Sequence, residues 1–287
     1  MKITIIGTGL IGGSMALKLK HKGIASKVYG TDLNQEHLED ALRLSIIDAK
    51  AGFEDGIKSA DLIMLTVPVD AAIRILPGIL DRIAGHQTVM DAGSTKSGIV
   101  NAVKGHPKRS RFVAFHPMWG TENNGPGAAT DHAFSGKAGV ICNQEESAAD
   151  ALQTVEKIAR GLDMHLIYMC EEDHDVHTAY ISHISHITSY ALANTVLEKE
   201  REEDTIFQLA SSGFSSTVRL AKSHPEMWVP IFKQNKENVL DVLNEHISQL
   251  RKFKSALEKE NFEYLGELIS NANRIRGILD NPLPGKV

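Results

Sequence analysis

The chain is 287 residues long, which is enough for one large domain or two of ordinary size. Apolar residues make up 42% and charged residues 23%, a composition that buries a core and excludes a mainly disordered chain. The formal net charge is -5, from 31 basic and 36 acidic residues, so there is no basic surplus to bind phosphate backbones. We therefore expect no nucleic-acid partner.

The cysteine content indicates a reducing compartment. Cys142 and Cys170 are too few for a disulfide framework and lack the CxxC spacing of a zinc site. The apolar start through Leu19 imitates a signal peptide, but glycines and lysines interrupt it. No other stretch approaches the ~20 apolar residues of a membrane span. We expect a cytoplasmic protein that is neither exported nor inserted in a membrane.

The first part of the chain alternates between strand and helix patterns. Strands are predicted at Lys2–Ile6, Lys27–Thr31, Asp61–Val67, Thr88–Asp91, Arg111–Phe115, Ala138–Cys142 and His165–Met169. Helical spacing occurs between several of them, as at Asp70–Ile83 and Ser147–Leu162. This alternation predicts an α/β domain with a doubly wound, mainly parallel sheet that is covered on both faces.

After about Cys170 the pattern changes to long helices with hardly any strand signal. They are predicted at Asp173–Glu200, Asp204–Leu220, Met227–Leu257 and Asn261–Leu279. We place the domain boundary near residue 169, giving an α/β domain of residues 1–169 and an all-α domain of residues 170–287, without a flexible linker. Gly120–Gly136 is predicted to be a long ordered loop, and such loops are often functional.

The first strand runs into a glycine motif. Gly7–Gly12 reads G-x-G-x-x-G between a strand and a helix, where backbone N–H groups hold a pyrophosphate. Asp32 ends the second strand at the separation expected of a ribose-binding carboxylate. The alternative is a glycine-rich turn with a solvated aspartate. The predicted cofactor-binding residues are Gly7, Gly9, Leu10, Ile11, Gly12, Asp32, Thr66, Val67 and Pro68.

The residues around Asp32 favour NAD over NADP. The carboxylate would repel the additional phosphate of NADP, and Leu33–Gln35 offers no arginine to attract it. Thr66–Pro68 follows another strand and is expected to face the nicotinamide half of the cofactor. An ordinary buried strand that ends at a proline is the alternative there.

Two polar segments follow strands in the middle of the chain. Asp91–Ser97 is expected at the carboxyl end of the sheet, where ligands bind, although helix capping is the alternative role for Ser94. His116 ends a strand and is held there by Pro117. Because imidazole titrates near neutrality, His116 suits a base that helps to oxidise a hydroxyl to a carbonyl. A structural histidine is the alternative.

Polar residues also gather in the helical part. His183 and His186 are three residues apart and share a helix face. With His174 and His177 they raise the alternative of a metal site, which we do not expect because the spacing has no HExxH pattern. The small, polar segment Ser211–Arg219 ends in a guanidinium that matches a carboxylate, so it predicts an anion pocket, with an exposed loop as the alternative.

Five motifs in this order resemble those of the prephenate/arogenate dehydrogenase family over essentially the full length of the chain. They are the GxGLIGGS loop, the Asp-x-Gly-Ser-x-Lys segment, His116-Pro117-Met118-x-Gly120-Thr121-Glu122, the Ile-Ser-His-x-x-His helix, and Ser-Gly-Phe followed by Arg219, Pro225 and Trp228. The resemblance implies a Rossmann-like NAD domain followed by a helical dimerisation domain that forms a homodimer.

The resemblance further implies an oxidative decarboxylation of prephenate to 4-hydroxyphenylpyruvate and CO₂, in tyrosine biosynthesis. By this likeness His116 takes the proton of the C4 hydroxyl, Ser94 orients His116, and Arg219 binds a substrate carboxylate. Whether Trp228 comes from the partner subunit is left open. The implied substrate-binding residues are His183, His186, Arg219, Thr121, Gly213 and Trp228.

Other functions remain as alternatives to this reading. They are an arogenate (cyclohexadienyl) dehydrogenase, a 3-hydroxyacid dehydrogenase or imine reductase of similar build, and an NAD-binding redox sensor without turnover. The expected pocket adds donors and positive charge, which favours the keto acid of prephenate over the ammonium of arogenate. Glu122 is the one carboxylate that would reverse this preference if it pointed inward.

Overall fold

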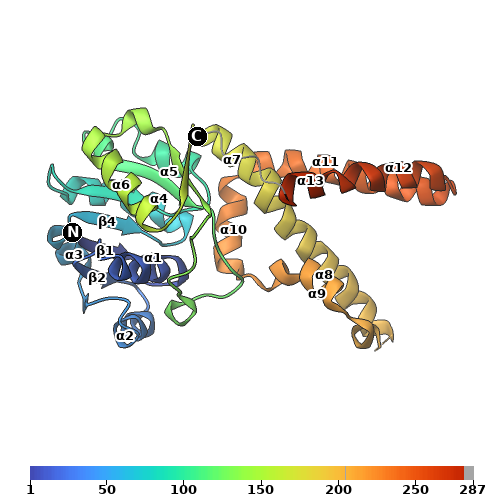
Figure 1. The fold of residues 1–287 in the computed structure, drawn as a ribbon, viewed down its shortest axis with the longest axis horizontal. Coiled ribbons are helices and arrows are strands. Elements are labelled where there is room, and N and C mark those ends of the chain that lie inside the picture. Colours follow the sequence, from blue (N-terminus) through green and yellow to red (C-terminus); the bar gives the residue numbers. More distant parts are fainter. Residues whose placement is uncertain (204, 281–287) are drawn as a thin grey trace. The chain divides into compact units, whose positions relative to one another are not determined.

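The computed structural model describes residues 1–203 and 205–280 (Figure 1). The chain divides into two compact units, one of residues 1–238 and a second from Val239 on. The predicted domain boundary at residue 169 coincides with the end of the last strand, and as a functional division it stays a prediction.

The core of the first unit is an eight-stranded sheet in the order β3-β2-β1-β4-β5-β6-β7-β8. Strands β6 and β7 pair antiparallel and the other neighbours pair parallel, so the predicted mainly parallel sheet is confirmed. The two residues of β3 are too few to give a sequence signal, and this strand was not predicted. The strands are β1 (Lys2–Ile6), β2 (Lys27–Thr31), β3 (Ala49–Lys50), β4 (Leu62–Leu65), β5 (Thr88–Asp91), β6 (Phe112–Pro117), β7 (Ala138–Cys142) and β8 (His165–Met169).

Helices cover both faces of this sheet because its strands are apolar on both sides (Figure 1). Successive residues of β1 point to opposite faces, so Ile5 joins one buried cluster and Ile6 the other. One face is covered by α1 (Leu10–His21), α2 (Gln35–Arg43) and α6 (Ala149–Gly161). The other is covered by α3 (Phe53–Ser59), α4 (Val69–Arg82) and α5 (Ser97–Ala102).

The strand order reverses at β1, which lies between β2 and β4. Ile6 is level with Thr31 on one side and with Leu65 on the other, and Leu65 is level with Asp91 of β5. The loops that follow these strands therefore leave the sheet along one edge. In open α/β sheets the crevice at this reversal is where ligands bind.

The helical part of the first unit differs in detail from its sequence pattern. The predicted helix at Asp173–Glu200 is present as α7 (Glu171–Thr178), a π-helical turn at Ala179–His183, and α8 (Ile184–Glu203). The single helix predicted over Asp204–Leu220 is wrong. Its serines and glycine are poor helix formers, and the segment forms only short helical pieces. These are Ile206–Leu209, α9 (Ser212–Thr217) and Arg219–Lys222.

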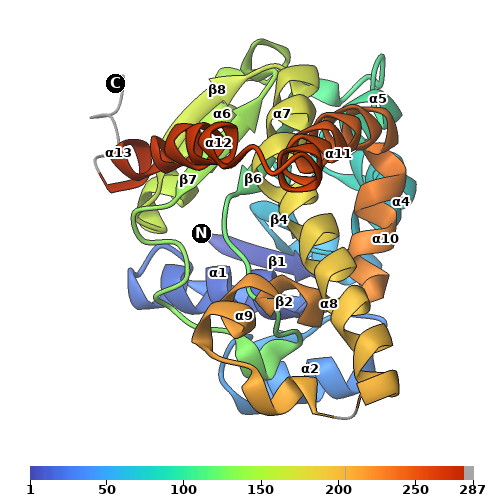
Figure 2. The ribbon, with the colours of Figure 1, turned by 90° about the vertical axis from the view of Figure 1, so that its right-hand side faces the viewer.

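The long helix predicted over Met227–Leu257 is two helices that meet at Asn235. They are α10 (Pro225–Gln234) and α11 (Lys236–Glu258). Helix α10 packs on α4, where Trp228 and Ile231 bury Val69 (Figure 2). Asn235 is buried, and its side-chain amide donates a hydrogen bond to the carbonyl of Asp175. The helix is therefore interrupted at a residue that bonds to another part of the fold.

The second unit is helical over its described residues, 239–280, as the sequence predicts. After α11 come α12 (Phe262–Asn273) and α13 (Ile275–Asp280). Large apolar side chains such as Leu250, Leu257 and Phe262 are more than half exposed. Among the described residues, none of the helices is both long and apolar enough to cross a membrane.

Candidate functional site

The glycine loop after β1 forms a cradle for an anion. Helix α1 begins after Gly9 and has no acidic residue in its first turn, so no acidic side chain of the helix itself competes for its first N–H groups and positive end. A Cβ added at Gly12 would lie 2.4 Å from Thr66 Oγ1, whereas one at Gly9 meets no atom within 4 Å. Gly12 is therefore needed for packing, and Gly9 leaves open space in front of the helix end.

Gly7 and Thr66 lock the turn that shapes this cradle. Gly7 has a φ of 100°, and an added Cβ would lie 2.6 Å from the carbonyl oxygen of Thr66. The hydroxyl of Thr66 donates a hydrogen bond to the carbonyl of Gly7 at 2.6 Å. Val67 lies partly buried against the core, and Pro68 precedes the first residue of α4.

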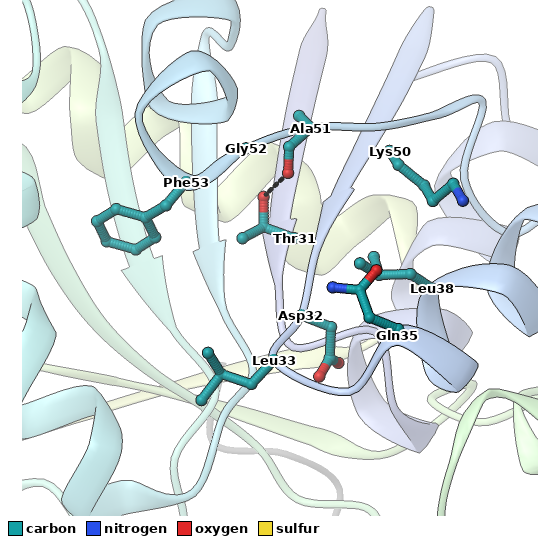
Figure 3. Close-up of a pocket in the computed structure, with 9 residues that line it drawn as sticks. All are labelled: Thr31, Asp32, Leu33, Gln35, Leu38, Lys50, Ala51, Gly52 and Phe53. Carbon is teal, nitrogen blue, oxygen red and sulfur yellow. Dashed lines mark hydrogen bonds between the residues drawn. The ribbon is translucent and has the colours of Figure 1, made fainter.

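Asp32 stands at the end of β2 beside this loop. Its Oδ2 accepts hydrogen bonds from Thr8 N at 2.8 Å and Thr8 Oγ1 at 3.1 Å, and its Oδ1 accepts one from Asn34 N at 2.9 Å. These bonds hold the carboxylate at one wall of a pocket of about 510 Å³ (Figure 3). Leu33, which is fully exposed, also lines this pocket.

Lys50 is a pocket residue that the sequence analysis missed. It comes from the short strand β3 and lines the same pocket as Asp32 and Gln35 (Figure 3). Its Nζ pairs with Glu39, so its positive charge is partly neutralised there. The charged residues near Asp32 therefore include a lysine, although Leu33–Gln35 contains no arginine.

The predicted base, His116, is buried near the end of β6 and is held by a second histidine. His116 Nδ1 lies 2.8 Å from Nε2 of His174, and the two rings meet edge to face. His174 Nδ1 lies 2.8 Å from Oδ1 of Asp175. The three side chains form a continuous chain of hydrogen bonds from β6 into α7.

Both oxygens of the carboxylate at the end of this chain accept hydrogen bonds. Asp175 Oδ1 also accepts from Lys96 N at 2.7 Å, and its Oδ2 accepts from Ser97 N at 2.9 Å, both at the start of α5. Burial alone would raise the pKa of Asp175, but the bonds from His174 and these backbone groups hold its pKa below the ordinary value. Asp175 is therefore the fixed negative charge of the site.

A buried ion pair lies under the loop between β5 and α5. The ammonium of Lys96 donates to Oδ2 of Asp91 at 2.5 Å and to the carbonyl of Gly93 at 2.7 Å. The other oxygen of Asp91 accepts from the backbone N–H of Phe115 at 3.1 Å. The pair thus fixes the loop that carries Ser94 next to the strand that carries His116.

Ser94 itself makes no hydrogen bond to His116 within the described part of the chain. It lies half-buried in the loop between β5 and α5, whereas the side chain that is hydrogen-bonded to His116 is that of His174. The role of Ser94 in orienting His116 therefore stays a prediction. His174 entered the sequence analysis only as a member of a metal cluster, because nothing in the sequence pairs it with His116.

The two histidines of the Ile-Ser-His-x-x-His motif lie near the same site. His183 Nδ1 is 3.1 Å from Nδ2 of Asn235, which also donates to the carbonyl of Asp175 at 2.6 Å. The ring of His186 stacks on Trp228 with centroids 3.4 Å apart, and His183 meets Trp228 edge to face. Trp228 thus contacts both histidines within its own chain, from a site on α10.

Three further predicted residues lie in more exposed positions. Arg219 is half exposed, and its Nη1 binds Oε2 of Glu122 at 2.9 Å. Glu122 therefore points at Arg219. Thr121 precedes it and accepts a hydrogen bond from Asn123 N, and Gly213 is exposed in α9. The predicted anion pocket is thus an arginine that is already paired with a carboxylate.

Burial keeps the histidines of the site neutral. Burial, above all, and the positive charge of nearby Lys96 lower the pKa of His116 well below its ordinary value of 6.5. Burial likewise lowers the pKa of His183 to about 4. Among the described residues, no group of three or more histidine, cysteine or acidic side chains is arranged to hold a metal ion.

The fold defines a nucleotide-binding α/β protein in which a neutral, buried histidine lies among polar side chains at the carboxyl end of β6. Residues 15–168 match the family model described as "Prephenate dehydrogenase, nucleotide-binding domain". Residues 171–271 match the model described as "Prephenate dehydrogenase, dimerization domain". The chain belongs to the prephenate dehydrogenase family, whose members are oxidoreductases.

Individual relatives agree with this assignment. The chain is 31% identical to a prephenate dehydrogenase of Bacillus subtilis, an alignment that covers 96% of this chain and 76% of that protein. It is 28% identical to a cyclohexadienyl dehydrogenase of Zymomonas mobilis, with 96% and 94% covered. A prephenate dehydrogenase of Aquifex aeolicus, solved with hydroxyphenyl propionate and NAD+, has a TM-score of 0.86 at 30% identity, with 96% and 97% covered.

The two glycines of the cradle should respond differently to alanine. Gly12→Ala should lower the melting temperature of the protein without nucleotide, because the new methyl group collides with Thr66 and the loop backbone. Gly9→Ala should leave the melting temperature unchanged and weaken NAD binding, because its methyl group fills the space before the helix end. Calorimetric unfolding and NAD titration of both variants measure these effects. Equal losses of stability would contradict the separate roles.

Proposed function

We propose that this chain oxidises prephenate with NAD, releasing CO₂ and 4-hydroxyphenylpyruvate. The observation that carries the proposal is His116, a neutral histidine buried at the edge of the sheet where the glycine loop opens, in a chain of the prephenate dehydrogenase family. When bound, NAD supplies the acceptor for the hydride that leaves C4 of the ring. Loss of the ring carboxylate as CO₂ then makes the ring aromatic, which drives the reaction.

The residues of the cradle fit NAD. The open space at Gly9 and the uncompensated start of α1 suit a pyrophosphate. Asp32 keeps a lone pair on Oδ1 for a ribose hydroxyl beyond the three hydrogen bonds that it accepts within the protein. Leu10 and Ile11 form the first turn of α1, and Thr66, Val67 and Pro68 line the adjacent strand end. This is the support for the proposed cofactor set.

His116 is the proposed base for the C4 hydroxyl. Its low pKa keeps it neutral, so it accepts the proton as the hydride leaves. Ser94 is proposed to hold the hydroxyl near His116 from the adjacent loop. The buried Lys96–Asp91 pair supports this role, because it fixes that loop against the backbone of β6.

The other polar residues are proposed to bind the rest of the substrate. His183, His186 and Trp228 form one packed group, which offers an aromatic wall and ring nitrogens. Arg219 is proposed to bind a substrate carboxylate in competition with Glu122, to which it is paired. Thr121 and Gly213 lie in the two segments that carry this pair, beside Glu122 and in α9.

We also propose that the chain works as a cytoplasmic homodimer. The match of residues 171–271 to a dimerization domain and the exposed apolar side chains of α11 and α12 support association through the helical part. Two free thiols, Cys142 and Cys170, fit a reducing compartment. Light scattering at micromolar concentration should give twice the mass of one chain.

Cofactor choice tests the position of Asp32. The native enzyme should have a higher kcat/KM with NAD than with NADP, because the carboxylate repels a 2′-phosphate. Asp32→Ser should reduce the ratio of kcat/KM with NAD to kcat/KM with NADP. Lys50→Gln in the Asp32→Ser background should raise this ratio again in part, because it removes an ammonium near the cofactor pocket. Initial rates with both cofactors measure this. A native preference for NADP would place Asp32 elsewhere than at the ribose.

The pH dependence tests His116. Neutral imidazole is the active form and exists above its pKa, so kcat/KM should stay level as the pH falls through 6.5 and should decline only well below it. His116→Asn should lower kcat by ~10²–10⁴, the usual contribution of a positioned base. A native acid limb centred at 6.5 or above, or a variant with native kcat, would remove His116 from this role.

Substrate preference tests the Glu122–Arg219 pair. The native enzyme should prefer prephenate to arogenate, because Arg219 and neutral histidines offer no free anion for an ammonium group. Glu122→Gln should keep prephenate activity, whereas Arg219→Ala should raise the KM for prephenate by about 10- to 100-fold through the lost charge-assisted bond. Steady-state kinetics with both substrates decide this. A kcat/KM for arogenate at or above that for prephenate would overturn the preference.

A further inference from the structure

The hydrogen bonds behind His116 determine which of its two nitrogens carries a proton. The ionised carboxylate of Asp175 only accepts, so His174 Nδ1, at 2.8 Å, must be the N–H donor of that bond. A neutral imidazole has one N–H, which leaves a bare lone pair at His174 Nε2. His116 Nδ1, at 2.8 Å from that lone pair, must then donate in its turn.

The other groups of the site agree with this direction. Both oxygens of Asp175 accept from backbone N–H groups at the start of α5, so the carboxylate has no reason to take up a proton. Burial, the nearby ammonium of Lys96 and the bond to Asp175 act together on His174, and the net effect is to lower its pKa. Both histidines are thus neutral at pH 7, and the chain of bonds runs from His116 to Asp175.

We propose that His174, fixed by Asp175, is a positioning residue that locks His116 in the tautomer with its proton on Nδ1. Nε2 of His116 then carries the free lone pair. This inference rests on the proposed function, in which that lone pair receives the proton of the substrate hydroxyl.

The tautomer of His116 matters because only one of the two can accept the proton of the substrate hydroxyl at Nε2. With its proton on Nε2, His116 would present a donor to the hydroxyl and would have no lone pair there to accept the proton. In serine proteases the wrong tautomer of the base lowers kcat by about 10⁴ when the orienting aspartate becomes asparagine. The relay also stabilises the imidazolium that forms, because His174 Nε2 continues to accept from Nδ1 while Asp175 supplies negative charge.

The neighbouring histidine has the opposite arrangement. Asn235 donates one amide N–H to the carbonyl of Asp175 and the other to Nδ1 of His183. Its carbonyl accepts from Asn238 Nδ2 at 2.7 Å, which fixes the orientation of the amide. Neutral His183 therefore carries its proton on Nε2, as a donor. Residues on α7 and at the junction of α10 and α11 thus set two buried histidines in different tautomers.

The tautomer can be measured directly on the resting protein by ¹⁵N NMR of labelled histidines, with the His116 signals assigned by comparison with His116→Asn. The native protein should show a protonated Nδ1 and a bare Nε2 at His116. His174→Phe should convert this to a mixture or to the other tautomer. His174→Gln, which keeps an acceptor near the former Nε2 position, should preserve the native state. His177→Phe, an exposed position on the same helix, is the matched control and should change nothing.

Kinetics complete the test. His174→Phe should lower kcat by about 10- to 100-fold, the range seen when the hydrogen-bond partner of a metal-binding histidine is removed, with the KM values for NAD and prephenate unchanged. A native His116 with its proton on Nε2 would overturn the proposal even if the His174 variants fail to fold. An unaltered tautomer in folded His174→Phe would also overturn it. Absence of prephenate oxidation by the native protein would instead overturn the proposed function, and the NMR result would stand apart from it.

Discussion

The carboxylate of Asp175 holds the site together. It is buried and negatively charged, a state that is costly unless hydrogen-bond donors stabilise the charge. The donors are two backbone N–H groups at the start of α5 and the ring of His174. Through these bonds one side chain of α7 joins the loop after β5 to His174 and, through it, to His116 on β6. The helical segment and the sheet thus meet at a charged group that neither could bury alone.

Charge is distributed unevenly around this point. Inside, the ammonium of Lys96 is matched by Asp91, and the histidines are neutral because burial lowers their pKa values. Further out, Arg219 and Glu122 form an ion pair whose two side chains are partly exposed to solvent. A neutral interior lets a histidine accept a proton from a hydroxyl. A charged, exposed edge suits carboxylates that arrive from water and must be recognised before they are buried.

The nucleotide end is built from backbone shape rather than from charge. Gly7 and Gly12 allow β1, the strand of Thr66 and α1 to approach more closely than any side chain permits. Asp32 is fixed by the same loop through Thr8, so the position of the carboxylate depends on the turn. The position of Asp32 is therefore coupled to packing at the centre of the sheet. The nearby Lys50 modifies the local charge without contributing to that framework.

The sequence by itself determined the features that are local. Runs of apolar residues predicted seven strands, the glycine spacing predicted the loop after β1, and the ordered motifs indicated the family. It failed at Asp204–Leu220, where serines and a glycine are poor helix formers, and at Asn235, whose buried side chain bonds to the carbonyl of Asp175. Only the tertiary structure paired His116 with His174, 58 residues apart, and turned Glu122 toward Arg219. Helix and strand periodicity reports which face of an element is buried, but the partner of a buried polar group depends on which elements pack together, and that is decided by the fold as a whole.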